Sequence, residues 1–304
     1  MYINRLSSTK NKKSMKFSFL LLICLSFVGI TVAQELEFAQ WKIKRKIELT
    51  GEDGWLNLVG LIWMEKDAPY LEEVNANTLG FGKISGATTL GKFEFVQDSV
   101  WFEPSKLAIQ KVPNEALSTR ILVYPIGYGS GEGVYYKNWK WTLIQRGGNY
   151  ALRLRDLNHP NLKNFIPTST FDYNAAYRFR AKMVPRFNQT LEIPNVLGQL
   201  ITWKVIGVLQ FERAGQQFEL LVLDELGKLF VLFSDETSAI ETYPTGRYLY
   251  VNPPDEQGMT TLDFNYAYNP PCAYTEFATC PIPPKSNRLP FAVLAGELMP
   301  EGHE

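Results

Sequence analysis

The sequence predicts a mainly β protein whose antiparallel sheets form sandwiches or barrels in two packed modules. Apolar and polar residues alternate with period two through most of the chain after residue 50, which is the spacing of a half-buried strand. Gly147-Gly148 separates two such runs, and two glycines at that spacing are typical of a tight hairpin. A cluster of prolines near the C-terminus predicts ordered coil in place of a further sheet.

The first 33 residues have the pattern of a secretory signal peptide. Met15-Lys16 opens an uncharged apolar run, Phe17–Ile30, and small residues up to Ala33 follow it. The run is shorter than the roughly 20 residues that cross a bilayer. We therefore expect cleavage after Ala33, export to the periplasm or the exterior, and no stable membrane span afterwards. An uncleaved anchor is the alternative, and Met15 is a second candidate start.

The charge balance of the chain changes once this segment is removed. The full sequence has 31 basic and 31 acidic residues, and residues 1–33 contain five of the basic ones and no acid. The mature chain would then hold 26 basic and 31 acidic residues, a formal charge of −5. Nucleic-acid-binding proteins normally carry a basic excess. The sequence therefore excludes nucleic acid as the expected partner.

Residues 34–137 are predicted to hold a short N-terminal helix and a small β module. Leu36, Ala39 and Ile43 recur at helical spacing within Glu35–Ile47, and glycine at 51 ends the pattern. The strand-like segments that follow are punctuated by glycines. A module boundary is expected near residue 137.

Residues 138–304 are predicted to form a C-terminal β module with a Pro/Cys-rich block. Eight of the 18 prolines lie between residues 253 and 290, where they remove backbone donors and favour coil. Strands are expected at Trp139–Arg146, Asn149–Arg155, Tyr177–Val184, Ile201–Phe211, Gln217–Asp224, Lys228–Phe233, Arg247–Val251, Thr260–Phe264 and Phe291–Ala295.

Residues for the common catalytic mechanisms are scarce. The chain contains no G-x-S-x-G, Walker A, H-E-x-x-H or EF-hand pattern. Of its two histidines, His303 lies beside the C-terminus and His159 precedes a proline in a predicted turn. The sequence indicates no metal site, and it leaves open which cofactor, if any, is used and whether the protein is an enzyme.

Two cysteines remain after signal cleavage, Cys272 and Cys280. In an oxidising compartment, a disulfide between them is the simplest expectation. Structural thiols, or a metal or redox role, are the alternatives that the spacing leaves open.

Polar residues on the late strands form the candidate site. In Thr261–Asn265, Asp263 and Asn265 share one face of the predicted strand, and Glu297 ends the last predicted strand. Arg247 would hold a carboxylate or phosphate, with Asn265 and Tyr268 as further ligand-binding residues. Asp263 and Glu297 would act as an acid/base pair or as cation ligands. The alternative is a structural Arg247–Asp263 ion pair.

This block of the sequence resembles the domain of unknown function 1684 family of bacteria and archaea. The resemblance rests on Thr237–Tyr250, Leu262–Asn265, Ala267–Cys272, Ala278–Pro281, and Ala295-Gly-Glu297, with an opening block at Gly54–Trp63. It implies an N-terminal β-sandwich similar to a forkhead-associated domain, by analogy of fold alone. The Asn75–Gly80 segment departs from the family's spacing, which weakens an expectation of phosphopeptide binding. Family members without signal peptides carry a similar cysteine pair, so a disulfide is not that pair's universal role.

These observations favour an exported protein with a small-molecule or anion-binding site in its C-terminal β module. If it is an enzyme, carboxylate-dependent hydrolysis fits a chain with so few histidines. The alternative is a non-catalytic structural or interaction protein in which the Pro/Cys block acts as a clamp.

Overall fold

The computed structural model describes residues 33–64, 67–75, 78–105, 108–112, 115–125 and 133–301. The predicted signal peptide therefore lies outside the described residues except at its last position. The chain divides into two compact units, Met1–Arg45 and Lys46–Glu304. Residues 33–50 are helical, slightly beyond the predicted Glu35–Ile47. Within the described ranges, no helix is long and apolar enough to cross a membrane.

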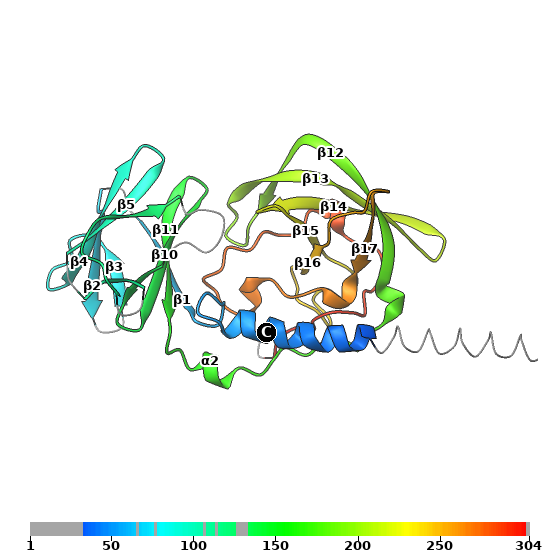
Figure 1. Cartoon of the computed structure of the whole chain (residues 1–304), viewed down its shortest axis with the longest axis horizontal. Helices are drawn as coiled ribbons and strands as arrows, with labels where there is room; N and C mark the ends of the chain where they lie inside the picture. The colour runs from blue at the N-terminus through cyan, green and yellow to red at the C-terminus, as the bar shows by residue number, and fades with distance from the viewer. Residues whose placement is uncertain are drawn as a thin grey trace, which may run out of the picture. The chain divides into compact units, whose positions relative to one another are not determined.

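The first two sheets are antiparallel and belong to the N-terminal part of the second unit (Figure 1). Sheet 1 has the strand order β1 (Leu58–Trp63), β11 (Asn149–Asp156), β10 (Trp139–Arg146), β9 (Val134–Tyr136), β6 (Gln110–Val112) and β7 (Glu115–Ala116). Sheet 2 has the order β3 (Thr78–Phe81), β2 (Tyr70–Asn75), β4 (Thr88–Val96), β5 (Ser99–Pro104) and β8 (Ile121–Tyr124).

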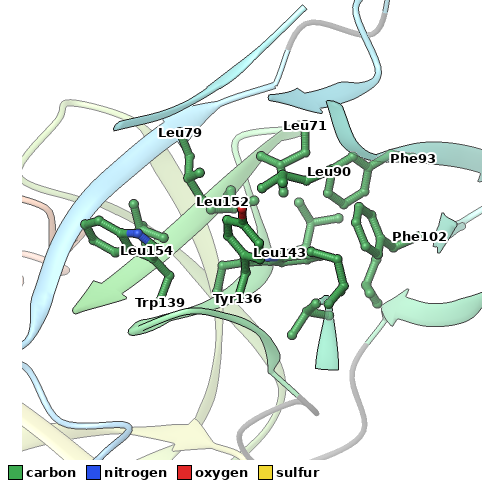
Figure 2. Close-up of a cluster of buried hydrophobic side chains, with 14 of the residues drawn as sticks. Leu71, Leu79, Leu90, Phe93, Phe102, Tyr136, Trp139, Leu143, Leu152 and Leu154 are labelled. Atoms are coloured by element: carbon green, nitrogen blue, oxygen red, sulfur yellow. The ribbon is translucent and has the colours of Figure 1, made fainter. Parts of the chain in front are cut away.

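Sheets 1 and 2 share one hydrophobic core, so together they form a sandwich. Figure 2 shows Phe93 and Phe102 of sheet 2 near Leu143 of sheet 1. The ring of Trp141 on β10 lies 5.5 Å from that of Phe93 and 4.8 Å from that of Phe102, centroid to centroid. These edge-on contacts fix the spacing of the two sheets because aromatic rings favour such geometry.

The glycine hairpin has the conformation that its sequence predicts. Gly147 and Gly148 have φ angles of +55° and +79°, the left-handed values that a two-residue turn of this type requires. Arg146 pairs directly with Asn149. The turn therefore fixes the register of β10 against β11, and with it the face on which each side chain lies.

Sheet 3 is also antiparallel and follows in the sequence. Its strand order is β16 (Arg247–Val251), β15 (Lys228–Phe233), β14 (Gln216–Glu225), β13 (Leu200–Arg213), β12 (Arg178–Pro194) and β17 (Met259–Asp263). The edge strands β16 and β17 come into contact, so the sheet curls into a half-barrel (Figure 1). The mainly β fold class is confirmed.

Both faces of sheet 3 carry apolar side chains. On β15, Val231 and Phe233 join the core of one face, whereas Phe230 and Leu232 join the cluster on the other. This explains the unbroken apolar run of that strand, which is typical of strands covered on both sides. The face that carries Phe230 also contributes residues to the candidate site.

The Pro-rich region after β17 is ordered coil, as predicted, with short 3₁₀ turns at Phe264–Tyr266, Pro271–Ala273 and Lys285–Asn287. The prediction of a strand at Phe291–Ala295 is wrong, because this segment is irregular. Its alternate residues Phe291, Val293 and Ala295 are nevertheless buried in the core. Its carbonyl groups at Val293 and Ala295 accept hydrogen bonds from an arginine side chain in place of a neighbouring strand.

The strand pairing does not change at residue 137. Strands β9, β10 and β11 pair within sheet 1, and the next strand of sheet 3 begins only at Arg178. A short helix, α2 (Asn161–Asn164), lies in the connection. The division of the chain into domains at residue 137 stays a prediction.

Candidate functional site

Four cationic side chains lie on the face of sheet 1 that points away from the sandwich core. Because neighbouring strand residues point to opposite faces, Lys140 and Arg146 on β10 lie opposite the core residue Trp141. Arg153 and Arg155 alternate in the same way on β11. The hairpin therefore concentrates positive charge on one face.

Lys140 forms ion pairs with two acidic side chains, and the charges of the same two residues act on Arg155. Lys140 Nζ lies 2.7 Å from Glu52 Oε1 and 2.9 Å from Asp53 Oδ1. Burial lowers the pKa of Lys140, but the hydrogen bonds to Asp53 and Glu52 outweigh it and the net pKa is raised. Arg155 donates from Nη2 to the Asp53 carbonyl oxygen at 3.2 Å. This half of the face is electrostatically compensated.

Arg146 and Arg153 have no acidic partner within the described residues. Arg146 Nε and Arg153 Nη2 both point to the Thr279 hydroxyl oxygen, at 3.3 and 3.5 Å. The Nε atom of Arg153 is buried without a hydrogen-bond partner. Burial, followed by the charges of Arg146 and Arg155, lowers the pKa of Arg153. Both side chains are half-buried, and two adjacent, partly desolvated guanidinium groups without a counter-charge are costly to maintain.

Aromatic rings adjoin the two arginines. The guanidinium carbon of Arg153 lies 5.2 Å from the centroid of the Trp55 ring, a cation–π arrangement. On sheet 3, the ring of Trp203 lies 5.8 Å from that of Phe230, and Phe230 lies 5.1 Å from Tyr248. The indole Nε1 of Trp203 is buried and has no hydrogen-bond partner.

These groups line one cavity of about 800 Å³. Its walls come from sheet 1, sheet 3 and the Pro/Cys block, and include Trp55, Arg146, Arg153, Trp203, Lys204, Asp224, Glu225, Phe230, Tyr248, Thr279 and Cys280. Burial raises the pKa of Glu225, although the Tyr250 hydroxyl donates to that carboxylate and partly offsets the effect. The cavity is thus cationic on its sheet 1 wall, aromatic on sheet 3, and acidic beside the β14–β15 turn.

The predicted ligand-binding residue Arg247 lies elsewhere, fully buried beneath the C-terminal coil. Its Nη2 lies 2.9 Å from Asp235 Oδ2, and both side chains have 0% exposure. Its guanidinium group also donates to the carbonyl oxygens of Val293 and Ala295. The ion pair expected as the structural alternative for Arg247 therefore exists, but with Asp235 in place of Asp263.

Asp263 and Asn265 lie together at the end of β17. Asp263 Oδ1 accepts from the backbone N and the Nδ2 of Asn265, and its Oδ2 lies 3.4 Å from Nε of Arg178. The amide of Asn265 also accepts from the backbone N of Asn174 and donates to that residue's carbonyl. These contacts close a turn and join it to the segment before β12.

Glu297 and Tyr268 are held by separate sets of contacts. Glu297 Oε2 accepts from the backbone N of Asn269 at 2.7 Å and from the Tyr274 hydroxyl at 3.0 Å. The ring of Tyr268 stacks on Tyr250 with centroids 5.9 Å apart. The structure does not bring Arg247, Asp263, Asn265, Tyr268 and Glu297 into the 800 Å³ cavity.

Cys272 and Cys280 lie side by side as thiols. The backbone N of Cys272 donates to Cys280 Sγ at 2.9 Å. A hydrogen bond from the Cys280 thiol lowers the pKa of Cys272, whereas burial raises that of Cys280. Their predicted disulfide stays a prediction. Within the described ranges, no group of three or more potential ligands is arranged to hold a metal ion.

Residues 163–298 match the model of a protein of unknown function family, DUF1684. The solution NMR structure of an uncharacterised protein of Haloarcula marismortui is 32% identical, covers 47% of this chain and 83% of its own, and has a TM-score of 0.39. No curated protein matches the sequence.

The chain belongs to the DUF1684 family. The DUF1684 match contains the sheet 3 wall of the cavity and the Pro/Cys block, with Trp203, Thr279 and Cys280. Arg146, Arg153 and Trp55 precede it. The cavity of this DUF1684 protein is therefore assembled from the matched region and from the sandwich before it.

Sequence reasoning did not identify Arg146, Arg153, Trp203 or Thr279 as site residues. The alternation of leucine and arginine in β11 was visible, but the same pattern describes any half-solvated strand. What distinguishes these arginines is that a second part of the chain covers their face, which sequence spacing does not reveal.

Proposed function

We propose that this protein is exported and binds a small anionic molecule in the 800 Å³ cavity, with Arg146 and Arg153 as its principal ligands. The observation that carries the proposal is the pair of half-buried guanidinium groups in the cavity wall that have no acidic partner among the described residues, with the Nε atom of Arg153 buried and without a hydrogen-bond partner. Arginine presents a planar fork of donors suited to carboxylate and phosphate groups. An anion between the two would compensate charge that the described protein groups leave uncompensated.

Thr279 supports the same arrangement. Its hydroxyl oxygen is the acceptor for both arginines, so the hydroxyl hydrogen is available to an incoming anion. Thr279 is itself buried. The three residues thus provide converging donors on one side of the cavity.

Inorganic phosphate and calorimetric melting provide the test. Phosphate at constant ionic strength should raise the Tm of the mature protein because a ligand that binds only the folded state stabilises it. Arg146→Met and Arg153→Met should lose this shift, whereas Arg186→Met, a change at an exposed arginine outside the cavity lining, should keep it. Equal shifts in all four proteins would overturn the proposal and favour the non-catalytic clamp.

Carboxylate-dependent hydrolysis is a second proposal, favoured by the position of Glu225. This carboxyl lines the same cavity and has a raised pKa, which brings an acid closer to the range useful for proton transfer. Hydrolysis of p-nitrophenyl phosphate that falls at least about a hundredfold in Glu225→Gln, with phosphate binding intact, would support it. Absence of turnover in the wild type would reject it.

Export is tested on the full-length precursor expressed in a bacterium with a periplasm. The mass of the protein recovered from that compartment should correspond to a chain that begins at residue 34. A protein retained in the cytoplasm with its first 33 residues would contradict export.

A further inference from the structure

The cavity is much larger than a simple inorganic anion requires. Its volume of about 800 Å³ lies in the range of roughly 300–1,000 Å³ that is typical of sites for drug-sized ligands. The two arginines and Thr279 occupy only one side. The remaining wall therefore has to be matched by the non-ionic part of the ligand.

The part of that wall that sheet 3 supplies beside Asp224 and Glu225 is aromatic. The ring planes of Trp203 and Phe230 are inclined by 35°, and Tyr248 meets Phe230 edge-on at 81°. Trp203 is half-buried, and with Phe230 and Tyr248 it lines the cavity. A partly exposed indole beside a cavity offers a flat face on which a ring can stack.

Trp203 also has an unsatisfied donor. Its Nε1–H group is buried without a hydrogen-bond partner, although buried donors are normally paired. The Nε–H group of Arg153 is also buried without a hydrogen-bond partner. The two orphaned donors lie on residues that line one cavity but belong to different sheets.

We propose that the natural ligand is an organic anion with a flat ring. Its carboxylate or phosphate group lies against Arg146, Arg153 and Thr279, and its ring lies against Trp203. This inference rests on the proposed anion-binding function, which it extends by naming the ligand class. A carboxylate and a phosphate group can each accept paired hydrogen bonds from two guanidinium groups. The experiment below therefore determines which of the two the ligand carries.

Isothermal titration calorimetry with four probes tests the inference: inorganic phosphate, phenyl phosphate, cyclohexyl phosphate and benzoate. Phenyl phosphate should bind about tenfold more tightly than inorganic phosphate, and more tightly than cyclohexyl phosphate, because a flat ring stacks and a puckered ring does not. Whichever of phenyl phosphate and benzoate binds more tightly identifies the head group, and either result supports a ring-bearing anion.

Variants of Trp203 separate stacking from charge recognition. Trp203→Leu should remove the advantage of phenyl phosphate while leaving the affinity for inorganic phosphate within about twofold. Trp203→Phe should restore most of the advantage, because it keeps the ring and loses only the N–H group. Trp101→Leu, a change on β5 outside the cavity lining, should behave like the wild type.

The outcomes distinguish this inference from the function on which it rests. Binding of inorganic phosphate with no gain from the ring would overturn the ring-bearing ligand and leave the anion site standing. Equal weakening of phosphate and phenyl phosphate in Trp203→Leu would also overturn it. Failure of all four probes would reject both.

Discussion

Asp235 and Arg247 form an ion pair that is closed to solvent on every side. Asp235 Oδ2 lies 2.9 Å from Arg247 Nη2, and Asp235 Oδ1 accepts from the backbone N of Val293 at 3.1 Å. Arg247 in turn donates to the carbonyl oxygen of Val293 at 3.0 Å. The pair therefore binds both the N–H and the C=O group of Val293. It takes the place of the neighbouring strand that would otherwise form hydrogen bonds with this segment.

Arg247→Met should destabilise the protein by about 3–5 kcal/mol, because it leaves Asp235 buried without its counter-charge. Urea unfolding monitored by tryptophan fluorescence measures this. Asp235→Val combined with Arg247→Met should cost less than the sum of the single changes. Arg120→Met, which breaks the more exposed pair with Glu94, should cost about 1 kcal/mol or less. Comparable losses in Arg247→Met and Arg120→Met would contradict the importance of burial.

Arg153→Met should stabilise the protein by about 1 kcal/mol in the absence of anions, because it removes a half-buried charge that lacks an acidic partner and whose Nε atom has no hydrogen-bond partner. Arg155→Met should have the opposite effect, since Arg155 donates to the Asp53 carbonyl. Thermal melting in a phosphate-free buffer measures whether each variant is more or less stable than the wild type. A clear loss of stability in Arg153→Met would identify that arginine as a structural residue instead.

Cys272 should react with iodoacetamide at least about tenfold faster than Cys280, because thiolate is the reactive form. The Cys280 thiol and the Tyr243 hydroxyl lower the pKa of Cys272, while burial raises that of Cys280. Tyr243→Phe should therefore slow the labelling of Cys272, whereas Tyr136→Phe, on β9 of sheet 1, should not. Peptide mass spectrometry measures both rates. Labelling that requires prior reduction would establish the predicted disulfide and contradict this expectation.

The ionisation of Glu225 should lower the free energy of unfolding as pH rises. Burial raises its pKa in the folded state, so the folded chain holds this proton more tightly than the unfolded chain. The stabilising contribution is complete below the unfolded pKa and is lost as pH rises through the folded pKa. Glu225→Gln should thus melt about 2 °C above the wild type at pH 7 and converge with it near pH 4. Glu219→Gln, at an exposed position of β14, should not change this profile.

The sequence predicted the elements whose conformation depends on neighbouring residues in the chain. The Gly147-Gly148 hairpin follows from two residues that tolerate positive φ, and the strands from Ile201 to Val251 follow from alternating or continuous apolar runs between turn residues. Phe291–Ala295 shows where this reasoning fails. An extended coil with one buried side has the same period as a strand, and only its hydrogen-bond partner, Arg247, separates the two.

The residues of the candidate site are brought together by tertiary contacts, which the spacing of residues in the sequence does not reveal. The sequence identifies Arg247 as a charge that needs a partner, but Asp235 lies in the connection between β15 and β16, and the sequence does not show that it reaches Arg247. The sequence predicts a strand at Arg153, but the partners of that side chain, Thr279 and Trp55, are 126 and 98 positions away in the sequence. Burial of the outer face of sheet 1 is a tertiary property.

The sharing of one cavity by two sheets has a mechanical consequence. Arg153 lies on sheet 1 and Thr279 in the block that covers sheet 3, so an anion held by both acts as a removable cross-link between segments far apart in the chain. Under the proposed function, such a link would add to the hydrogen bond that Thr275 donates to the Leu58 carbonyl, which also joins these two regions. The force needed to separate the two regions should therefore rise with anion concentration.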